Sequence, residues 1–168
     1  MKIKKLSKNF LINLFVIVTI FSLDRISKLY VIYLYKKNFN SEIFTSKFLN
    51  IYLIWNEGIA FGLFSFHQDN LYNILTVIIL IIILIILFFL IKTEGLKKYA
   101  LLMVFGGAIG NLFDRIFYKA VPDFIDFHIG NFHWFIFNVS DIFITCGIMI
   151  MIILEFADKK KINGDEKI

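Results

Sequence analysis

The stretch from 71 to 91 is the strongest constraint on this chain, because no charged residue interrupts it. About 20 apolar residues suffice to cross the hydrocarbon core of a bilayer as a helix. Three further apolar stretches of that length occur, at about 10–35, 99–117 and 137–156. Hydrophobic residues make up 59% of the chain and charged residues only 18%, against about 25% in soluble domains. We therefore predict an all-α membrane protein with four transmembrane helices, a single domain over 1–168, with no role in binding nucleic acid.

Basic residues outside these spans fall mostly on one side of the predicted membrane. One side carries the two tails and the 92–98 loop, with Lys2, Lys4, Lys5, Lys8, Lys92, Lys97, Lys98, Lys159, Lys160, Lys161 and Lys167. The other side carries only Lys36, Lys37, Lys47 and Lys119. Lysine and arginine accumulate in cytoplasmic loops. We expect both termini in the cytoplasm and the 36–70 and 118–136 loops on the outer side.

The first outer loop has the composition of a strand pair. Its segment KFLNIYLIWNEGIAFGLF is rich in aromatic and β-branched residues, with an Asn-Glu-Gly turn signal in the middle. We expect a small β-hairpin there, turning at 56–58 and lying on the membrane surface.

Ionisable residues inside the spans are concentrated toward the outer side. An ionisable group within a membrane is costly and is a functional hypothesis by default. Asp24 lies about 14 residues into the first span, which is roughly 21 Å at 1.5 Å per residue. The other ionisable residues inside the spans are Arg25, Lys28, Asp114, Arg115 and Asp141. The second span has none. Their common depth predicts one polar cluster.

Helical spacing suggests how these groups pair. Asp24 and Lys28 are four residues apart and share a helix face. Arg115 is expected to be the buried partner of Asp114 or of another carboxylate in a span. Gly106 and Gly110 form a small-xxx-small step that permits close helix packing. Most of these residues are interpreted as holding a site together.

Two carboxylates remain as candidates for chemistry. Asp141 begins the fourth span, and the VPDFIDF segment offers Asp123 or Asp126 at the outer edge. Two neighbouring carboxylates can share a proton, so that one activates water while the other protonates a carbonyl or a leaving amine. Spacing alone does not choose between Asp123 and Asp126. If the segment is extended, they point to opposite sides, and Asp126 is expected to face water or headgroups.

Five motifs in order resemble the lipoprotein signal peptidases (signal peptidase II), a family of membrane aspartic proteases. They are DRISK at 24–28, NEGIAF at 56–61, GGAIGNLFDR at 106–115, VPDF at 121–124 and FNVSD at 137–141. Ser140 stands where the family usually has alanine, and Pro122 precedes the candidate aspartate.

This resemblance implies an aspartic endopeptidase of the bacterial inner membrane whose active site faces outward. Its substrates would be diacylglyceryl-modified prolipoproteins, cut just before the lipidated cysteine, and its other partners membrane lipids. The family pattern assigns catalysis to Asp123 and Asp141, with no metal or cofactor, and we expect a monomer. The matching positions that support or line the site are Asp24, Lys28, Asn56, Gly58, Ala60, Phe61, Gly107, Asn111, Asp114, Arg115, Phe124 and Asn138.

Two other classes of protein are compatible with four short spans. A small proton-coupled transporter would use carboxylates near the membrane midplane and a polar path from both sides. Here the inner half carries almost no polar residues, which argues against such a path. A structural membrane protein would use the glycine step but would not need two outer carboxylates. His67, His128 and His133 all fall in outer loops, and we interpret them as solvent- or interface-facing rather than as metal ligands.

Overall fold

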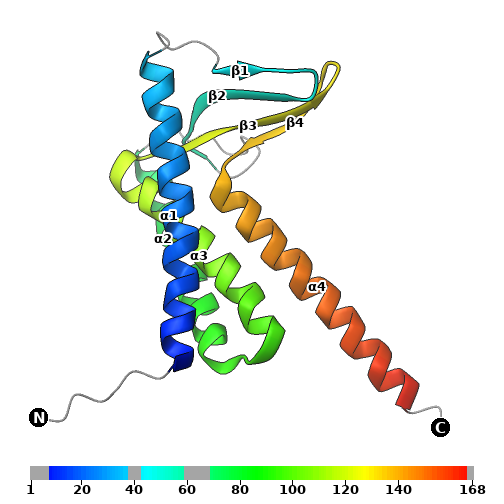
Figure 1. The fold of residues 1–168 in the computed structure, drawn as a ribbon. Helices are drawn as coiled ribbons and strands as arrows, with labels where there is room; N and C mark the ends of the chain where they lie inside the picture. The colour runs from blue at the N-terminus through cyan, green and yellow to red at the C-terminus, as the bar shows by residue number, and fades with distance from the viewer. Residues whose placement is uncertain (1–7, 38–42, 59–68, 166–168) are drawn as a thin grey trace, which may run out of the picture.

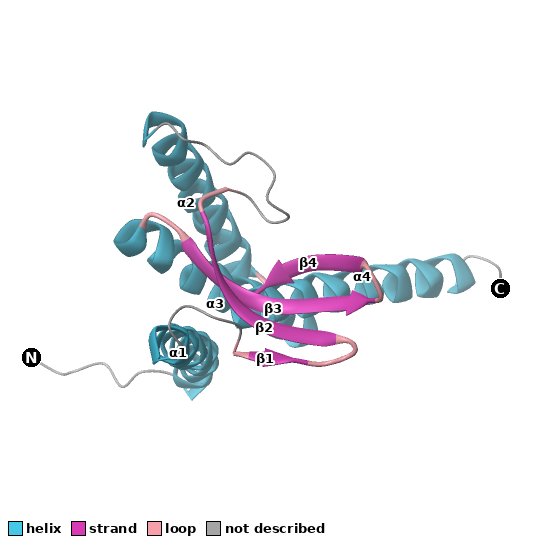
Figure 2. Ribbon diagram, turned by 90° about the horizontal axis from the view of Figure 1, so that it is seen from above, coloured by secondary structure: helices cyan, strands magenta, loops and turns pink. Residues whose placement is uncertain are grey.

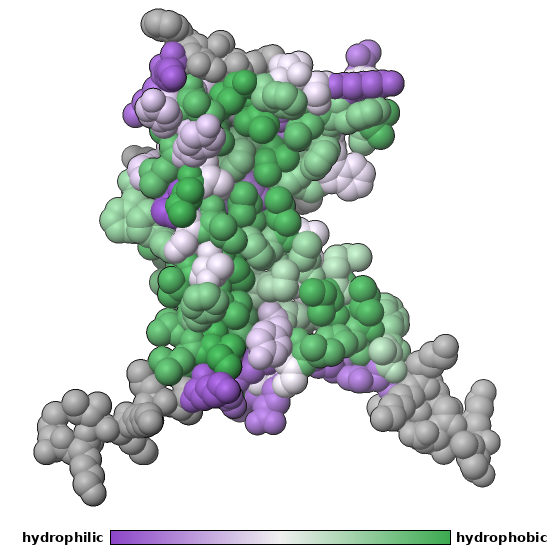
Figure 3. Space-filling model, in the orientation of Figure 1, coloured by the Kyte–Doolittle hydropathy of each residue, from purple (hydrophilic) through white to green (hydrophobic). Residues whose placement is uncertain are grey.

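The computed structural model describes residues 8–37, 43–58 and 69–165. Four helices occur in this part, each long and apolar enough to cross a membrane, which confirms the four predicted spans. They are α1 (Lys8–Lys37), α2 (Asp69–Lys92), α3 (Gly95–Tyr118) and α4 (Val139–Asp165). The first turn of α1 and the last turn of α4 lie at the same end of the molecule, opposite the sheet (Figure 1). Apolar side chains cover the middle of the visible face, and hydrophilic ones gather toward its two ends (Figure 3).

A four-stranded antiparallel sheet lies at the other end of the helices (Figures 1 and 2). Its strands follow one another in chain order: β1 (Phe44–Thr45), β2 (Leu49–Asn56), β3 (Val121–Ile129) and β4 (Phe132–Phe137). The sheet thus combines both loops that were expected to face outward. β2 belongs to the loop that follows α1, and β3 follows α3. Because β2 pairs with β3, the ends of these two helices are connected through the same sheet.

The first outer loop contains a strand pair, β1 and β2, which turns between Thr45 and Leu49, where Ser46 bonds to Leu49. At the expected turn, Asn56 ends β2 and its Oδ1 accepts from the N–H of Gly58. The second arm of the hairpin expected around 56–58 lies outside the described residues. The second outer loop supplies the other two strands, joined by Gly130 and Asn131, with Gly130 at a φ of 59°. A Gly-Asn pair between apolar, β-branched runs is a hairpin signal that the sequence analysis passed over.

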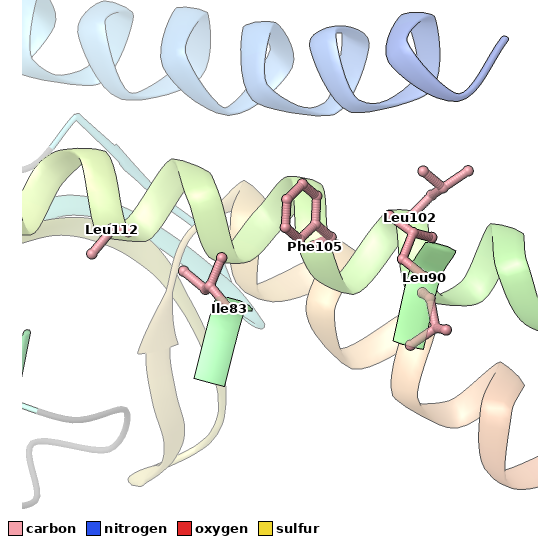
Figure 4. Packing of buried hydrophobic residues seen from close by; sticks show 6 residues of the cluster. Ile83, Leu90, Leu102, Phe105 and Leu112 are labelled. Atoms are coloured by element: carbon pink, nitrogen blue, oxygen red, sulfur yellow. The ribbon is translucent and has the colours of Figure 1, made fainter. Parts of the chain in front are cut away.

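Helix α3 is the centre of the helical bundle. In its most apolar window 56% of the residues are buried, against 11–17% in the other three helices. Leu102, Phe105 and Leu112 follow one another along α3, and Ile83 and Leu90 of α2 belong to the same cluster (Figure 4). Many other apolar side chains of the helices are exposed, among them Phe15, Ile26, Ile91 and Phe156, as expected for helices whose solvent is lipid.

Close approach of α3 and α4 depends on glycine. A Cβ atom at Gly147 of α4 would lie 2.6 Å from the carbonyl oxygen of Ala100 in α3. At Gly106, a Cβ atom would meet only side-chain atoms of Ile20, at 3.1–3.3 Å. Relief of the Gly147 contact requires a shift of the α3 backbone, whereas the Gly106 contacts, which include the Cβ atom of Ile20, require a shift of only a few tenths of an ångström.

We therefore predict that Gly147→Ala destabilises the protein by about 1–3 kcal/mol, the range for overpacking a close contact. Gly106→Ala is the matched control and should cost clearly less. Thermal unfolding of both variants in one detergent checks this. Equal melting temperatures for the two variants would show that α3 and α4 can move apart at Gly147 at less energetic cost than the 2.6 Å contact indicates.

Candidate active site

A fully buried ionic cluster joins α1 to α3. Asp24, Lys28 and Asp114 each have no exposed surface. The Lys28 ammonium lies 2.9 Å from the Asp24 carboxylate and 2.7 Å from Oδ2 of Asp114. An ammonium has three N–H donors, and the third bonds to Oδ1 of Asn111 at 2.9 Å. The predicted Asp24–Lys28 pairing is present, and every donor of this buried cation has an acceptor.

The second cation of the cluster is Arg25, not Arg115. Arg25 pairs with Oδ1 of Asp114 and lies over the ring of Phe113, 5.0 Å from its centroid. Two carboxylates therefore meet two cations, which limits the electrostatic cost of burying them. Arg115 was expected to pair with Asp114 or with another carboxylate in a span, but among the described residues it forms no ion pair and donates to backbone carbonyls instead. Adjacent residues of a helix point in different directions, so Arg115 and Asp114 need not meet.

Arg115 instead fixes the backbone of the outer loop. Its Nη2 donates to the carbonyl oxygen of Gly58 at 2.9 Å, and its Nη1 donates to the carbonyl oxygen of Asn111 at 3.4 Å. The N–H of Gly58 in turn donates to Oδ1 of Asn56 at 2.9 Å. Arg115 and Gly58 therefore hold the end of β2 against α3.

Asn111 transmits the position of the ionic cluster to Asp141. Its Oδ1 accepts from Lys28, which is only a donor, so its amide N–H₂ must face the other way. There Nδ2 donates to Oδ1 of Asp141 at 2.8 Å. The buried Lys28 ammonium thereby determines which group of Asn111 reaches the Asp141 carboxylate.

Asp141 sits in a capping box at the start of α4. Oδ1 of Asn138 accepts from the N–H of Asp141 at 3.2 Å, and Oδ2 of Asp141 accepts from the N–H of Asn138 at 3.0 Å. This reciprocal pair satisfies two backbone donors at the helix N-terminus. The FNVSD motif contains this signature at the spacing N-x-x-D, a local reason for its residues that the sequence analysis did not use.

Asn138 also holds Asp123, so this residue contacts both candidate carboxylates, that of Asp141 through its backbone N–H and that of Asp123 through its side-chain amide. Its Nδ2 donates to Oδ1 of Asp123 at 2.6 Å, while Nδ2 of Asn56 donates to Oδ2 of Asp123 at 2.8 Å. Asp123 lies on β3 and is only 4% exposed. Burial, together with the negative charge of Asp141, raises the pKa of Asp123 to about 6, although the two amide donors and Lys28 act in the opposite direction.

Close packing of α4 on α3 brings the two aspartates to the same place. A Cβ atom at Gly107 would lie 2.6 Å from the carbonyl oxygen of Ser140, and one at Gly110 would collide with the Ser140 hydroxyl and lie 2.7 Å from Oδ2 of Asp24. The N–H of Ser140 donates to Oδ1 of Asp24 at 3.0 Å. Glycine is therefore required where the buried cluster meets the first turn of α4.

Two cavities meet at Asp141. A cavity of about 290 Å³ is lined by Asp123 and Asp141 together with the polar side chains of Asn56, Asn111, Arg115 and Asn138. A larger one, of about 630 Å³, runs between the β3–β4 hairpin and α4, and its lining is almost wholly apolar. Asp141, Phe135, Phe137 and Thr145 line both. The arrangement can hold an apolar chain beside a pair of carboxyl groups.

The other residues singled out from the sequence are distributed as follows. Phe124 packs against Val31 and Leu53 in a small core beneath the sheet. Ala60 and Phe61 lie outside the described residues, as does His67.

Asp126 does not face water, as was expected from an extended segment. It is fully buried, and its carboxylate lies 2.8 Å from Nδ1 of His133. His128 and His133, interpreted as not spaced for a metal, are cross-strand neighbours, and with Asp126 they form a cluster that could hold an ion. The spacing H-x₄-H was the overlooked signal, because it falls within the range seen for zinc ligands.

Comparison with known proteins agrees with the motifs. The model of the family described as signal peptidase (SPase) II matches residues 16–157. This chain belongs to the signal peptidase II family. The resemblance inferred from the five motifs is thereby confirmed, the chain is a membrane peptidase, and the transporter interpretation has no support.

Individual relatives extend over nearly the whole signal peptidase II chain. The lipoprotein signal peptidase of Pelagibacter ubique (strain HTCC1062) is 48% identical over 157 residues, covering 93% of this chain and 95% of that one. The lipoprotein signal peptidase of Anaplasma phagocytophilum (strain HZ) is 39% identical, covering 92% and 97%. A solved structure of a bacterial membrane enzyme, determined by the in meso method at 2.3 Å resolution, superposes with a TM-score of 0.71 at 28% identity, covering 89% and 90%.

The buried cluster predicts a large loss of stability for Lys28→Met. Methionine preserves the apolar stem but leaves Asp24 without a cation in a buried site, which costs about 3–5 kcal/mol. The matched control is Lys97→Met, which removes an exposed ion pair with Glu155 and Asp158 and should leave stability unchanged within error. Chemical unfolding in mixed micelles measures both. Equal effects would mean that water reaches the Lys28 ammonium.

Proposed function

We propose that this signal peptidase II removes signal peptides from diacylglyceryl-modified prolipoproteins, cutting before the lipidated cysteine, with Asp123 and Asp141 as its catalytic pair. The observation that carries the proposal is the pair itself: two carboxylates from different elements, bridged by Asn138, line one small polar cavity. The function is in keeping with the names of the relatives.

The proposal includes an orientation. Lysines near the free ends of α1 and α4 and in the α2–α3 loop favour the cytoplasm by the positive-inside rule. The sheet and the aspartate pair then lie at the outer face of the bacterial inner membrane, in one multi-pass domain that acts as a monomer. A substrate held in the membrane by its diacylglycerol would present its scissile bond at that depth.

The apolar cavity beside Asp141 supports a lipid-anchored substrate. Its lining side chains from β3, β4 and α4 include Phe127, Trp134 and Ile142. Such a surface binds hydrocarbon and excludes water, and the polar cavity adjoins it through Asp141. The peptide bond next to a lipidated residue would therefore reach the carboxyl pair without leaving the membrane surface.

The proposed chemistry uses one proton held by the pair. Because the pKa of Asp123 is raised to about 6, this residue holds a proton up to about pH 6 and can supply it to the substrate. Ionised Asp141 removes a proton from water, whose oxygen attacks the scissile carbonyl carbon, while Asp123 protonates the carbonyl oxygen. When the tetrahedral intermediate collapses, the C–N bond breaks, the proton on Asp141 passes to the leaving amine of the lipidated cysteine, and a hydroxyl of the intermediate returns its proton to Asp123 as the carboxyl product forms. No step draws on a metal or cofactor.

Substitution of the pair tests these roles. Asp123→Asn and Asp141→Asn should both fold and both fail to cleave, because asparagine keeps the volume but cannot exchange the proton. Asp126→Asn, three residues from Asp123 on the same strand, should lower cleavage less than about tenfold, or 1.4 kcal/mol of barrier.

The assay follows cleavage of a lipidated prolipoprotein by purified protein in micelles, at matched folded concentration and with or without a chelator. A dead Asp126→Asn beside an active Asp123→Asn would show that the pair is misassigned. Loss of activity in the chelator, restored by zinc, would overturn the metal-free mechanism if it also occurs in the double variant His128→Gln/His133→Gln, which lacks the two imidazoles of the β3–β4 hairpin.

The pKa of Asp123 predicts a descending limb in the pH profile. Below about pH 6 Asp123 holds its proton, and above it kcat/KM should fall as the proton is lost. Asn56→Ala removes a donor that stabilises the ionised form, so the pKa should rise and the limb should move to higher pH.

The control for this prediction is Asn50→Ala. Asn50 lies on the same strand, but its amide contacts Asp126 at 3.4 Å, so the limb should not move. Profiles of kcat/KM for the three proteins decide the matter. A limb that moves to lower pH in Asn56→Ala would contradict the assignment of Asp123 as the proton donor.

A further inference from the structure

A second cluster of ionisable side chains lies in the sheet, apart from the proposed catalytic pair. Asp126 and His128 point from β3, and His133 points from the neighbouring position of β4, opposite His128. Each offers one ligand atom, and these atoms all lie within 4.8 Å of one another. A shift in register between Asp126 and His128 brings the carboxylate toward His133. Such bulges commonly re-aim a side chain.

The carboxylate in this cluster is short of positive charge. Asp126 has no exposed surface, yet within the described part of the chain its only ion-pair partner is His133, whose side chain is 51% exposed and which is charged only when protonated. The buried carboxylates in the helices show the contrast, because Asp24 and Asp114 are met by permanently charged groups. Buried charges in proteins are generally paired or coordinate metals.

Two polar atoms around Asp126 also lack partners. Nδ1 of His128 and Oδ1 of Asn50 are buried and have no hydrogen-bond partner among the described residues. Asn50 is the residue of β2 that pairs with Asp126. A cation bound by the cluster would have two effects at once. It would accept the lone pair of the unpartnered His128 nitrogen, and it would compensate the negative charge of Asp126. Protonation of His133 alone would leave His128 unpartnered.

We propose that Asp126, His128 and His133 form a binding site for a divalent transition-metal ion of the zinc type. Two imidazoles and one carboxylate are donors that suit such ions, and the spacing H-x₄-H agrees with known zinc ligands. Metal–nitrogen bonds of about 2.0–2.1 Å bring tetrahedral ligand atoms to about 3.3 Å from one another. His133 already approaches Asp126 to 2.8 Å, and its exposure gives the side chain room to move and the ion a way in.

The site would join the β3–β4 hairpin internally and take no part in peptide cleavage. Asp123 and its amide donors are not among its ligands, so the inference is independent of the proposed function. A bound ion would stabilise the hairpin that lines the apolar cavity, because His128 also borders that cavity.

The test is metal binding by the full chain, prepared in detergent without a polyhistidine tag and stripped with a chelator. Titration with Zn²⁺ should give one saturable site per chain, and Co²⁺ should give the visible absorption of a tetrahedral site. Mg²⁺, which prefers oxygen ligands, should not compete. Absence of saturable Zn²⁺ binding below about 100 μM, roughly 5.4 kcal/mol of binding free energy, would overturn the proposal.

Variants locate the site. His128→Gln and His133→Gln should each weaken Zn²⁺ binding at least tenfold, and the double variant should abolish the cobalt spectrum. Asn131→Ala changes the same hairpin without removing a ligand and should bind as the wild type does. Binding that is unchanged in the double variant would place the metal elsewhere and refute the site.

A measurement on the wild-type chain guards against misfolded variants. Zn²⁺ should protect His128 and His133 from acylation by diethyl pyrocarbonate, read residue by residue by mass spectrometry, with His67 as the internal reference. Equal modification of His128 and His133 with and without zinc would contradict the proposal. Neither result depends on cleavage activity, so failure of this inference is distinguishable from failure of the proposed peptidase mechanism.

Discussion

The Lys28 ammonium is the group on which the rest of the site depends. It is fully buried, and its three donors reach Asp24, Asp114 and Asn111. These contacts fix the rotation of α1 against α3, because a buried cation without its carboxylates would be far more costly than any apolar alternative. They also orient the amide of Asn111 toward Asp141. The Lys28 charge, which has no role in the proposed chemistry, thereby helps to position Asp141, which does.

Neutral side-chain amides connect Lys28 to the two aspartates through a series of hydrogen bonds. Asn111 bonds Asp141, Asn138 bonds both Asp141 and Asp123, and Asn56 completes the set. Each step crosses between elements, from α3 to α4, from α4 to β3, and from β3 to β2. The sheet is required for this chain of contacts, because it places non-helical backbone at the end of a membrane bundle while pairing its N–H and C=O groups.

The sequence predicted well what depends on local pattern and poorly what depends on distant pairing. Apolar length located the four spans, and i,i+4 spacing found Asp24 with Lys28. Spacing could not show that Asp114 meets Arg25, 89 residues away, because no local rule connects two helices. The β3–β4 hairpin was not predicted, although the Gly-Asn pair at 130–131 is a recognised hairpin turn signal. Asp126 was misplaced because its strand pairs on both sides, with β2 and with β4, and β4 had not been expected.

The use of amides instead of cations beside the two aspartates has a chemical reason. An arginine or lysine bonded directly to Asp123 would favour the ionised form strongly and hold the pKa of that carboxyl low. Asn56 and Asn138 position the carboxylate with uncharged donors, so burial and the charge of Asp141 still raise the pKa of Asp123 to about 6. The permanently charged side chains that organise the bundle do not bond to the two aspartates directly. Lys28 bonds to Asn111 instead of Asp141, and Arg115 bonds to the carbonyl oxygen of Gly58. The fold thus separates the charges that give rigidity from the carboxyl that must keep a proton up to about pH 6.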